Sequence, residues 1–188
     1  MKILDTERLS LHQLSTDDAA FMLGLLNQPS FLRFIGDRGV RTIEDARKYL
    51  LKGPIDSYRR LGFGLYMVEL KDGKTPIGLC GLVKREALPD VDIGFALLPE
   101  FWSRGYAFEA ASAVLAHGRA ALGLRRIVAV VSQDNERSIG LLAKLGLRFE
   151  RLVAWPEDGS ELKLYAVAFD APTPAGIKTS GGTTRRKR

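Results

Sequence analysis

The sequence predicts a single α/β domain with a mixed central β-sheet of about seven strands, flanked by about four helices. Three observations lead to this class. The chain has 188 residues, which is about the length of one domain. Its 46% hydrophobic and 27% charged residues lie near the globular average, so wholesale disorder is not expected. Strand-like and helix-like patterns alternate along it in the order β-α-α-β-β-β-α-β-α-β-β.

The first part of the chain predicts one strand and two helices. Residues 9–14 contain the short apolar–polar alternation of a strand. Residues 15–18 and 42–45 both have the capping-box spacing that begins a helix. We expect the first helix to end near residue 27. The second should be interrupted at residues 53–54, a Gly-Pro pair, which gives a broken two-piece helical segment.

The middle of the chain predicts a strand meander and a long helix. The pair Asp72-Gly73 lies between two apolar runs and is a strong hairpin signal. The long helix should end at Gly123, because glycine readily adopts the left-handed conformation found after helices. The expected strands are residues 63–70, 75–83 and 91–98, and the expected helix is residues 105–122.

The last third predicts a buried strand, a short helix and two further strands. The first strand is a continuous apolar run, as expected when both faces of the sheet are covered. Right-handed crossovers would place the long helix against one face of the central sheet. The expected strands are residues 126–132, 148–155 and 161–168, and the short helix is residues 138–145.

The net charge of +6 belongs to the C-terminal end. Residues 1–170 hold 23 basic and 22 acidic residues, so the expected domain has no global charge signature of nucleic-acid binding. We expect a single domain over residues 1–170 and a flexible tail over residues 171–188, rich in Gly, Thr and Pro. The tail is either a solvated end or an arm that contacts RNA, phosphate or an acidic partner.

Several other classes are not expected. No apolar run approaches the roughly 18 residues of a membrane span, and charges occupy the N-terminal positions where a signal peptide is apolar. Cys80 is the single cysteine and is expected to be buried rather than nucleophilic. His12 and His117 have no partner at metal-ligand spacing, so no metal site is expected. The expectation is a soluble, cytoplasmic domain.

Residues 97–110 form the most informative segment, in which a strand ends, a loop turns and an Ala-rich helix begins at Gly105. The unpaired N–H groups of such a first turn carry the positive end of the helix dipole, and a pyrophosphate is a natural ligand for them. Gly105 and Ala107 are small enough to let phosphate oxygens approach the backbone. Arg104 adds a cation. A purely structural turn is the alternative.

Residues 134–149 begin a second helix with polar side chains. Asp134 or Asn135 can cap this helix, and Asn135, Ser138 and Leu142 share one of its faces. The amide and the hydroxyl could contact a polar ligand together. The alternative is that Asn135 only caps the helix and Ser138 is an ordinary first-turn residue.

These segments occur in a fixed order: Thr6-Glu7-Arg8-Leu9 near the N-terminus, then Trp102 to Ala110, then Asn135 to Gly146. The ordered set resembles the GCN5-related N-acetyltransferase (GNAT) superfamily, specifically its branch of ribosomal-protein N-terminal acetyltransferases, over about residues 4–168. The resemblance implies the acyl-CoA N-acyltransferase fold and acetyl-CoA as the co-substrate, without a metal.

The resemblance also assigns roles to residues. Backbone amides of residues 102–107 would bind the pyrophosphate, and the strand end at 97–98 would pair with the pantetheine arm. Ser138 matches the position that assists the departing thiolate. The implied acetyl-CoA-binding residues are Leu97, Leu98, Trp102, Ser103, Arg104, Gly105, Tyr106, Ala107, Asn135, Ser138 and Lys144.

The identity of the base stays open at this point. Glu161, four residues before Tyr165, falls where relatives often carry an acidic residue beside the acceptor, and the implied catalytic residues are Ser138 and Glu161. Asp92 falls where relatives more often carry glutamate. Both differ in length from the commoner residue, which leaves Glu161, Asp92 and water as alternatives. Ser103 departs from the glycine of many relatives, which should stiffen the loop slightly.

The chemistry favours an α-amine acceptor. A free α-amine has a pKa of about 7.7–8.0, whereas a lysine near 10.4 needs much more help to lose its proton. We therefore expect direct acetyl transfer to a protein or peptide N-terminus. A small amine (polyamine, amino sugar or amino acid derivative), a non-catalytic acyl-CoA-binding module and a nucleic-acid-binding domain are alternatives. Residues 43–60 and 155–161 should shape the acceptor site, and monomer or homodimer stays open.

Overall fold

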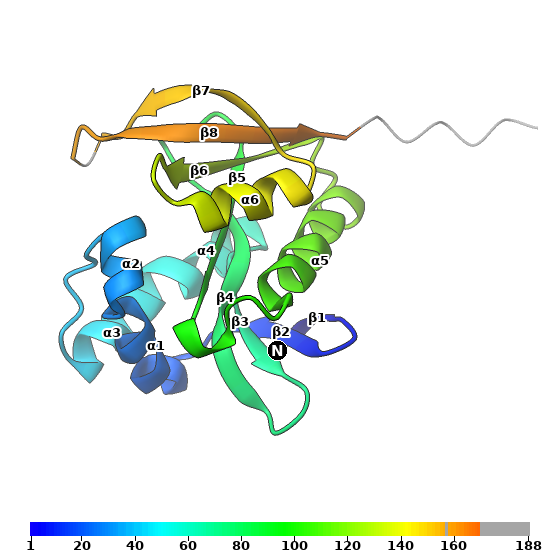
Figure 1. The fold of residues 1–188 in the computed structure, drawn as a ribbon. Helices are drawn as coiled ribbons and strands as arrows, with labels where there is room; N and C mark the ends of the chain where they lie inside the picture. Colours follow the sequence, from blue (N-terminus) through cyan, green and yellow to red (C-terminus); the bar gives the residue numbers. More distant parts are fainter. Residues whose placement is uncertain (157, 170–188) are drawn as a thin grey trace, which may run out of the picture.

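A computed structural model describes residues 1–156 and 158–169, so the expected tail at 171–188 lies outside the described residues. One mixed β-sheet of eight strands runs through the molecule in the order β1-β2-β3-β4-β5-β6-β8-β7 (Figure 1). Neighbouring strands are antiparallel except β5 and β6, which are parallel. The predicted α/β class and mixed central sheet are therefore confirmed. Within the described residues, no helix is both long and apolar enough to cross a membrane.

The N-terminal part contains two elements that the sequence analysis missed, the edge strand β1 and the helix α2. β1 is four residues long, too short to show an alternation, and α2 begins directly at Pro29, just after the predicted end of the first helix. Both predicted capping boxes form. The elements are β1 (Lys2–Asp5), β2 (Leu9–Gln13), η1 (Thr16–Asp18), α1 (Ala19–Leu26), α2 (Pro29–Phe34), α3 (Ile43–Leu50), η2 (Leu51–Ile55) and α4 (Asp56–Leu61).

The predicted interruption at residues 53–54 is present as the π-helical turn η2, which joins α3 to α4. Pro54 lies inside this turn, where its missing N–H prevents regular α-helical bonding. The broken segment therefore continues in one direction through a single widened turn.

The remaining elements match the predicted order closely. The Asp72-Gly73 turn joins β3 to β4, and Gly73 has a φ of 72°, as the hairpin signal requires. The elements are β3 (Leu65–Leu70), β4 (Thr75–Lys84), β5 (Val91–Leu97), η3 (Pro99–Phe101), α5 (Tyr106–Ala120), β6 (Arg126–Ser132), α6 (Glu136–Lys144), β7 (Arg148–Ala154) and β8 (Glu161–Ala168).

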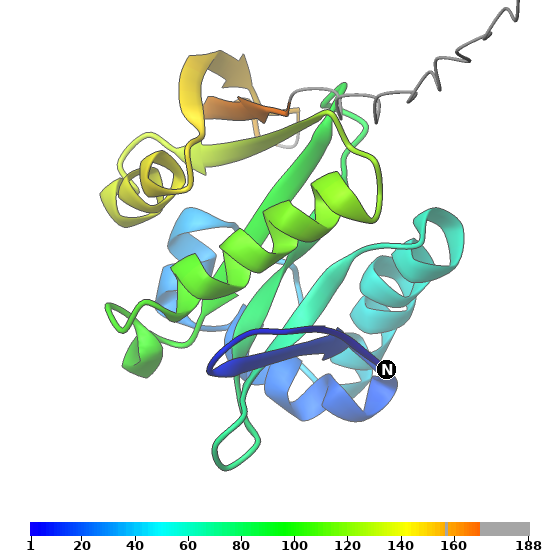
Figure 2. The same cartoon turned by 90° about the vertical axis from the view of Figure 1, so that its right-hand side faces the viewer.

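Helices cover both faces of the sheet. The helix α5 lies on one face, and α1 and α3 lie on the other (Figures 1 and 2). The period-2 alternation of β3 divides the core accordingly. Tyr66 and Val68 pack in the cluster that contains α5 residues such as Val114, whereas Met67 packs with Met22 of α1. This two-sided burial fixes the register of the central strands, and hence the place where β5 ends and α5 begins.

Candidate active site

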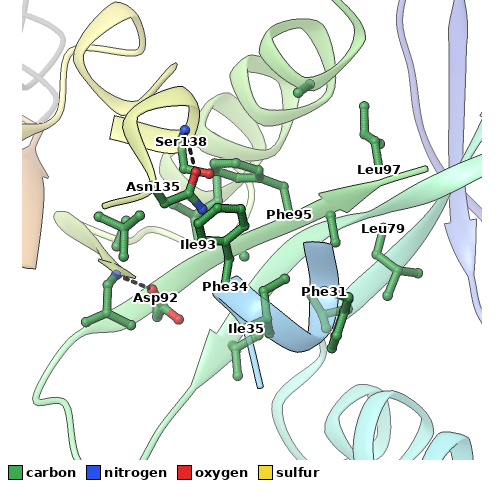
Figure 3. Close-up of a pocket in the computed structure, with 18 of the residues that line it drawn as sticks. Phe31, Phe34, Ile35, Leu79, Asp92, Ile93, Phe95, Leu97, Asn135 and Ser138 are labelled. Atoms are coloured by element: carbon green, nitrogen blue, oxygen red, sulfur yellow. Dashed lines mark hydrogen bonds between the residues drawn. The ribbon is translucent and has the colours of Figure 1, made fainter. Parts of the chain in front are cut away.

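The parallel strands β5 and β6 separate soon after they meet. Their pairing is limited to Val91 with Ile127 and Asp92 with Val128, so the rest of β5 leaves β6. A cavity of about 1370 Å³ opens at this point, lined by residues of β5, β6, α2 and the beginnings of α5 and α6. Figure 3 shows Asp92 and Leu97 toward opposite ends of this stretch of β5, with Asn135 and Ser138 from α6 nearby.

The open edge of β5 can bind an extended ligand through its backbone. The amide of Leu98 donates to the carbonyl of Ile77 on β4, at 2.9 Å. The backbone groups of successive strand residues point to alternate sides of the strand. Because those of Leu98 point toward β4, those of Phe95 and Leu97 point toward the gap between β5 and β6. Leu97 lines the cavity but Leu98 does not, which divides the predicted pair. The Leu97 carbonyl also accepts a hydrogen bond from Trp102 Nε1 at 2.8 Å, so the loop side chain braces the strand end.

The loop before α5 opens the first turn of this helix toward the cavity. Ser103 and Gly105 have φ values of 60° and 83°, both in the left-handed region. Gly105 occupies the N-cap position, and no side chain caps the helix, so its first amides remain available to an anion. Ser103, Gly105, Tyr106 and Ala107 line the cavity as predicted.

Arg104 is the exception in this loop. Its exposed side chain does not line the cavity, and its guanidinium lies 5.9 Å from the ring centre of Phe101. The structure therefore places the Arg104 side chain outside the cavity that the other loop residues line. Trp102 does line the cavity, and the guanidinium of Arg137 from α6 lies 4.9 Å from its ring centre. This contact joins the loop to the beginning of α6.

The beginning of α6 carries the predicted polar pair. Asn135 caps the helix, since its Oδ1 accepts a hydrogen bond from the Ser138 amide at 3.2 Å (Figure 3). This contact uses the backbone amide of Ser138 and not its hydroxyl. Asn135, Ser138 and the exposed Lys144 all line the cavity, so the cap and a place beside a ligand are compatible.

Asp92 is a buried carboxylate on the cavity wall, at the last residue before β5 and β6 separate. Its side chain is 2% exposed, and its Oδ2 accepts a hydrogen bond from Arg85 Nε at 2.6 Å. Its Oδ1 accepts one from the Val130 amide at 3.3 Å. Burial raises the pKa of Asp92 to about 6, although the Arg85 charge and both hydrogen bonds oppose this. Asp92 can therefore exchange a proton near neutral pH.

Glu161 lies elsewhere. It begins β8 opposite Ala154 of β7, its side chain is exposed, and it is not among the residues that line the cavity. Asp92 and Ser138 thus line the same cavity, and Glu161 does not. In the sequence, only the family resemblance indicated Glu161. The property that distinguishes Asp92 is its burial, which depends on the packing of β5 against β6.

The helix α2 forms a wall of the cavity that sequence reasoning did not identify. Phe31, Phe34 and Ile35 line the cavity from this side (Figure 3). Arg33 forms an ion pair with Asp134 at 3.0 Å, and the hydroxyl of Ser132 donates to the carbonyl of Phe34 at 3.2 Å. These two contacts connect α2 to the end of β6. Trp155, beside the Arg85 guanidinium at 5.5 Å, lines the cavity as a further aromatic residue.

The remaining candidate residues lie outside the cavity. Cys80 is buried, and burial raises the pKa of its thiol, which makes it a poor nucleophile. His12 lies 3.7 Å from Glu69, and His117 lies within α5. In the described part of the chain, no group of three or more His, Cys, Asp or Glu residues could hold a metal ion.

Comparisons with known proteins agree with this arrangement. The model of the acetyltransferase (GNAT) domain family matches residues 8–148. The uncharacterized N-acetyltransferase YoaA of Bacillus subtilis is 33% identical over 150 residues, covering 79% of this chain and 84% of YoaA. The solved GNAT-family acetyltransferase from Bacillus anthracis has a TM-score of 0.73 at 25% identity, covering 89% of this chain and 98% of its own.

A further solved structure shows the same fold at lower identity. The ribosomal L7/L12 alpha-N-protein acetyltransferase RimL, in complex with coenzyme A, has a TM-score of 0.73 at 18% identity. The match covers 92% of this chain and all of RimL.

The mixed sheet, with its cavity between parallel strands that separate, defines an acyltransferase of the acyl-CoA N-acyltransferase fold. The chain belongs to the GNAT acetyltransferase family, and it is an acetyl-CoA-dependent N-acetyltransferase. The resemblance read from the ordered sequence segments is thereby confirmed.

Proposed function

We propose that this enzyme transfers the acetyl group of acetyl-CoA directly to the α-amine of a protein or peptide N-terminus, in a ternary complex without an acyl-enzyme. The buried carboxylate of Asp92, on the cavity wall where β5 and β6 separate, is the observation that carries the proposal.

The residues present fit acetyl-CoA as the co-substrate. The cavity of about 1370 Å³ is large enough for an extended ligand. The backbone of Phe95 and Leu97 can pair with the amides of the pantetheine arm, and the uncapped first turn of α5 can bind the pyrophosphate. These features support an alignment of the thioester along β5, with its reactive end toward Asp92.

The proposed step needs one proton acceptor and one hydrogen-bond donor. Asp92 takes one proton from the bound ammonium, and the neutral nitrogen then attacks the thioester carbonyl. The second proton, which the nitrogen loses as the amide forms, passes to solvent. As the new C–N bond forms and the tetrahedral intermediate collapses, the C–S bond breaks and its electron pair leaves on sulfur. The Ser138 hydroxyl donates a hydrogen bond to the departing thiolate. Asp92 then returns its proton to solvent.

The pKa of Asp92 supports an α-amine acceptor over a lysine. With the Asp92 pKa at about 6, proton transfer from an α-ammonium near 8 is uphill by about 2 pKa units, or about 3 kcal/mol. Transfer from a lysine near 10.4 is uphill by about 4 units, or about 6 kcal/mol. The related RimL fold, which belongs to an alpha-N-protein acetyltransferase, also supports this choice.

The acceptor class can be tested with matched peptides. A lysine-free peptide with a free N-terminus is compared with the same peptide bearing a blocked N-terminus and one internal lysine, each with acetyl-CoA. We expect acetylation of the first peptide, detected as a mass increase at its N-terminal residue. Transfer only to the lysine peptide, or only to polyamines, amino sugars or amino acid derivatives in a parallel panel, would contradict the proposed acceptor.

Replacing Ser138 with Ala should lower kcat by about 10- to 100-fold, the loss expected for one hydrogen bond to a charged group. The KM for acetyl-CoA should change little, because the cap between Asn135 and Ser138 uses the backbone amide and survives the substitution. Steady-state kinetics measure both values. Ser10→Ala, which removes a hydroxyl bound to Asp5 on the far strand, is the matched control. An unchanged kcat in Ser138→Ala would remove Ser138 from the mechanism.

A further inference from the structure

A turn between β1 and β2 is bound to the first turn of α5 by a dense set of hydrogen bonds. Glu109 of α5 accepts these bonds through its two carboxylate oxygens. Its Oε1 accepts from Thr6 Oγ1 at 2.5 Å and from the Arg8 amide at 2.8 Å. Its Oε2 accepts from Arg8 Nε at 2.7 Å and lies 2.7 Å from Arg8 Nη2. The segment Thr6–Arg8, more than 100 positions away in sequence, thus meets α5 directly beside the loop described above.

Arg8 also contacts three consecutive residues, Arg104 and Gly105 of that loop and Tyr106 at the start of α5. Its Nη1 donates to the carbonyl of Arg104 at 3.0 Å, and its guanidinium lies 4.6 Å from the ring centre of Tyr106. A Cβ atom at Gly105 would lie 3.2 Å from Arg8 Nη2, so the guanidinium packs against the glycine itself. One side chain therefore contacts Gly105 and the residues on both sides of it.

The bond to the Arg104 carbonyl controls where the next amide points. In a planar trans peptide, the C=O of Arg104 and the N–H of Gly105 point in opposite directions. Because Arg8 holds the carbonyl on its own side, the Gly105 amide is directed away from Arg8. Ser103 and Gly105, on either side of Arg104, both have left-handed backbone conformations, and left-handed residues are among those from which anion-binding nests of backbone amides are built.

A left-handed conformation at Ser103 is unfavourable without support. An isolated loop of this shape would relax, and its amides would then lose their common direction. Arg8 is not itself free to neutralise a ligand, since Glu109 pairs with it. Partial burial favours protonated Glu109, but hydrogen bonds from Thr6 and Arg8 outweigh this and lower its pKa, so the pair stays ionised at neutral pH.

We propose that Thr6, Arg8 and Glu109 form a positioning clamp that holds the Arg104–Gly105 peptide in the orientation that binds the pyrophosphate of acetyl-CoA. This inference rests on the acetyl-CoA site of the proposed function. The clamp residues do not touch the ligand. They act through the loop, and they explain why the N-terminal segment Thr6–Arg8 accompanies the loop sequence in this chain.

The test compares two acetyl donors, acetyl-CoA and S-acetyl-pantetheine, which lacks the pyrophosphate. In Arg8→Lys the ion pair to Glu109 can persist, but a lysine cannot bind both carboxylate oxygens and the Arg104 carbonyl as the planar guanidinium does. We expect the KM for acetyl-CoA to rise about ten-fold, with kcat at saturation changed less than two-fold. The kcat/KM for S-acetyl-pantetheine should stay unchanged. Glu109→Gln should show the same pattern, and provides a second variant if Arg8→Lys folds poorly.

Asp5→Asn is the matched control, because Asp5 belongs to the same N-terminal segment but is bound to Lys2, Ser10 and Lys71 rather than to α5. It should leave both donors unaffected. Equal losses for both donors in Arg8→Lys, together with a lower Tm, would show that these contacts only hold β1 and β2 against α5. Unchanged acetyl-CoA kinetics in both clamp variants would likewise overturn the clamp. A wild-type enzyme that uses both donors equally well would instead overturn the pyrophosphate site, and the clamp with it.

Discussion

Replacing Asp92 with Asn is expected to lower kcat by about 10²- to 10⁴-fold, the usual contribution of a positioned general base. The amide has nearly the same shape, and its one oxygen can still accept the hydrogen bond from Arg85, although the bond from the Val130 amide is lost. The amide cannot take a proton from the amine. Acetyl-CoA binding should be retained. Folding should be retained as well, because burial makes the ionised carboxylate less favourable in the folded chain than in water, and the substitution removes that charge.

The pH dependence provides an independent readout of the same residue. Burial raises the pKa of Asp92 to about 6 in the folded enzyme, so the carboxylate becomes protonated as the pH falls through about 6. The kcat/KM for the amine should therefore fall below this pH in a way that the Asn variant does not share. The free energy of unfolding should change in the opposite direction, because the buried charge of Asp92 destabilises the folded chain. This destabilisation is absent below the unfolded pKa near 4 and fully present above about 6.

Glu161→Gln separates the two candidate carboxylates. Its side chain is exposed and outside the cavity, so we expect less than a three-fold change in kcat. A large loss in Glu161→Gln with full activity in Asp92→Asn would assign the proton acceptor to Glu161. Full activity in both variants would leave water as the acceptor.

Replacing Gly105 with Asp is expected to weaken acetyl-CoA binding by about 100-fold or more. The new carboxylate would lie at the open first turn of α5, where the pyrophosphate is proposed to bind, and like charges in a partly buried site repel by several kcal/mol. The φ of 83° at this position adds strain for any side chain. Calorimetric titration of acetyl-CoA into the wild type and the variant measures the difference directly.

Gly105→Asn is the matched control, because Asn has the same size and similar backbone preferences but no charge. It should lose only about ten-fold, through strain and contact with Arg8. The gap between the Asp and Asn variants should narrow as salt is raised, since screening weakens the repulsion. Equal binding by the Asp and Asn variants would show that the pyrophosphate does not lie at this helix.

The sequence predicted correctly those features that depend only on residues close together in the chain. The two capping boxes, the Asp72-Gly73 hairpin and the start of the long helix at Gly105 depend only on residues a few positions apart, and all are present. The apolar periods identified seven of the eight strands. The short edge strand β1 and the six-residue helix α2 were missed, because elements of this length show no clear period and are stabilised by the neighbours against which they pack.

The candidate site divides in the same way. The loop of Gly105 and the pair Asn135 and Ser138 were found as local motifs, and both reach the cavity. The choice between Asp92 and Glu161 was not available from spacing. The burial of Asp92 depends on the packing of β5 against β6, whose paired residues are about 35 positions apart. The clamp between Arg8 and Glu109 joins residues 101 positions apart.

By itself, then, the sequence determined the α/β class and the order of its elements, because these depend on short-range periodicity, capping and turn chemistry. Its ordered segments also carried the resemblance to the acetyltransferases. The tertiary structure decided which carboxylate lies beside the cavity, which strand residues expose their backbone and what holds the loop in its left-handed conformation. These properties depend on dielectric environment and on contacts between distant segments, which form only when the sheet and the helices have packed together.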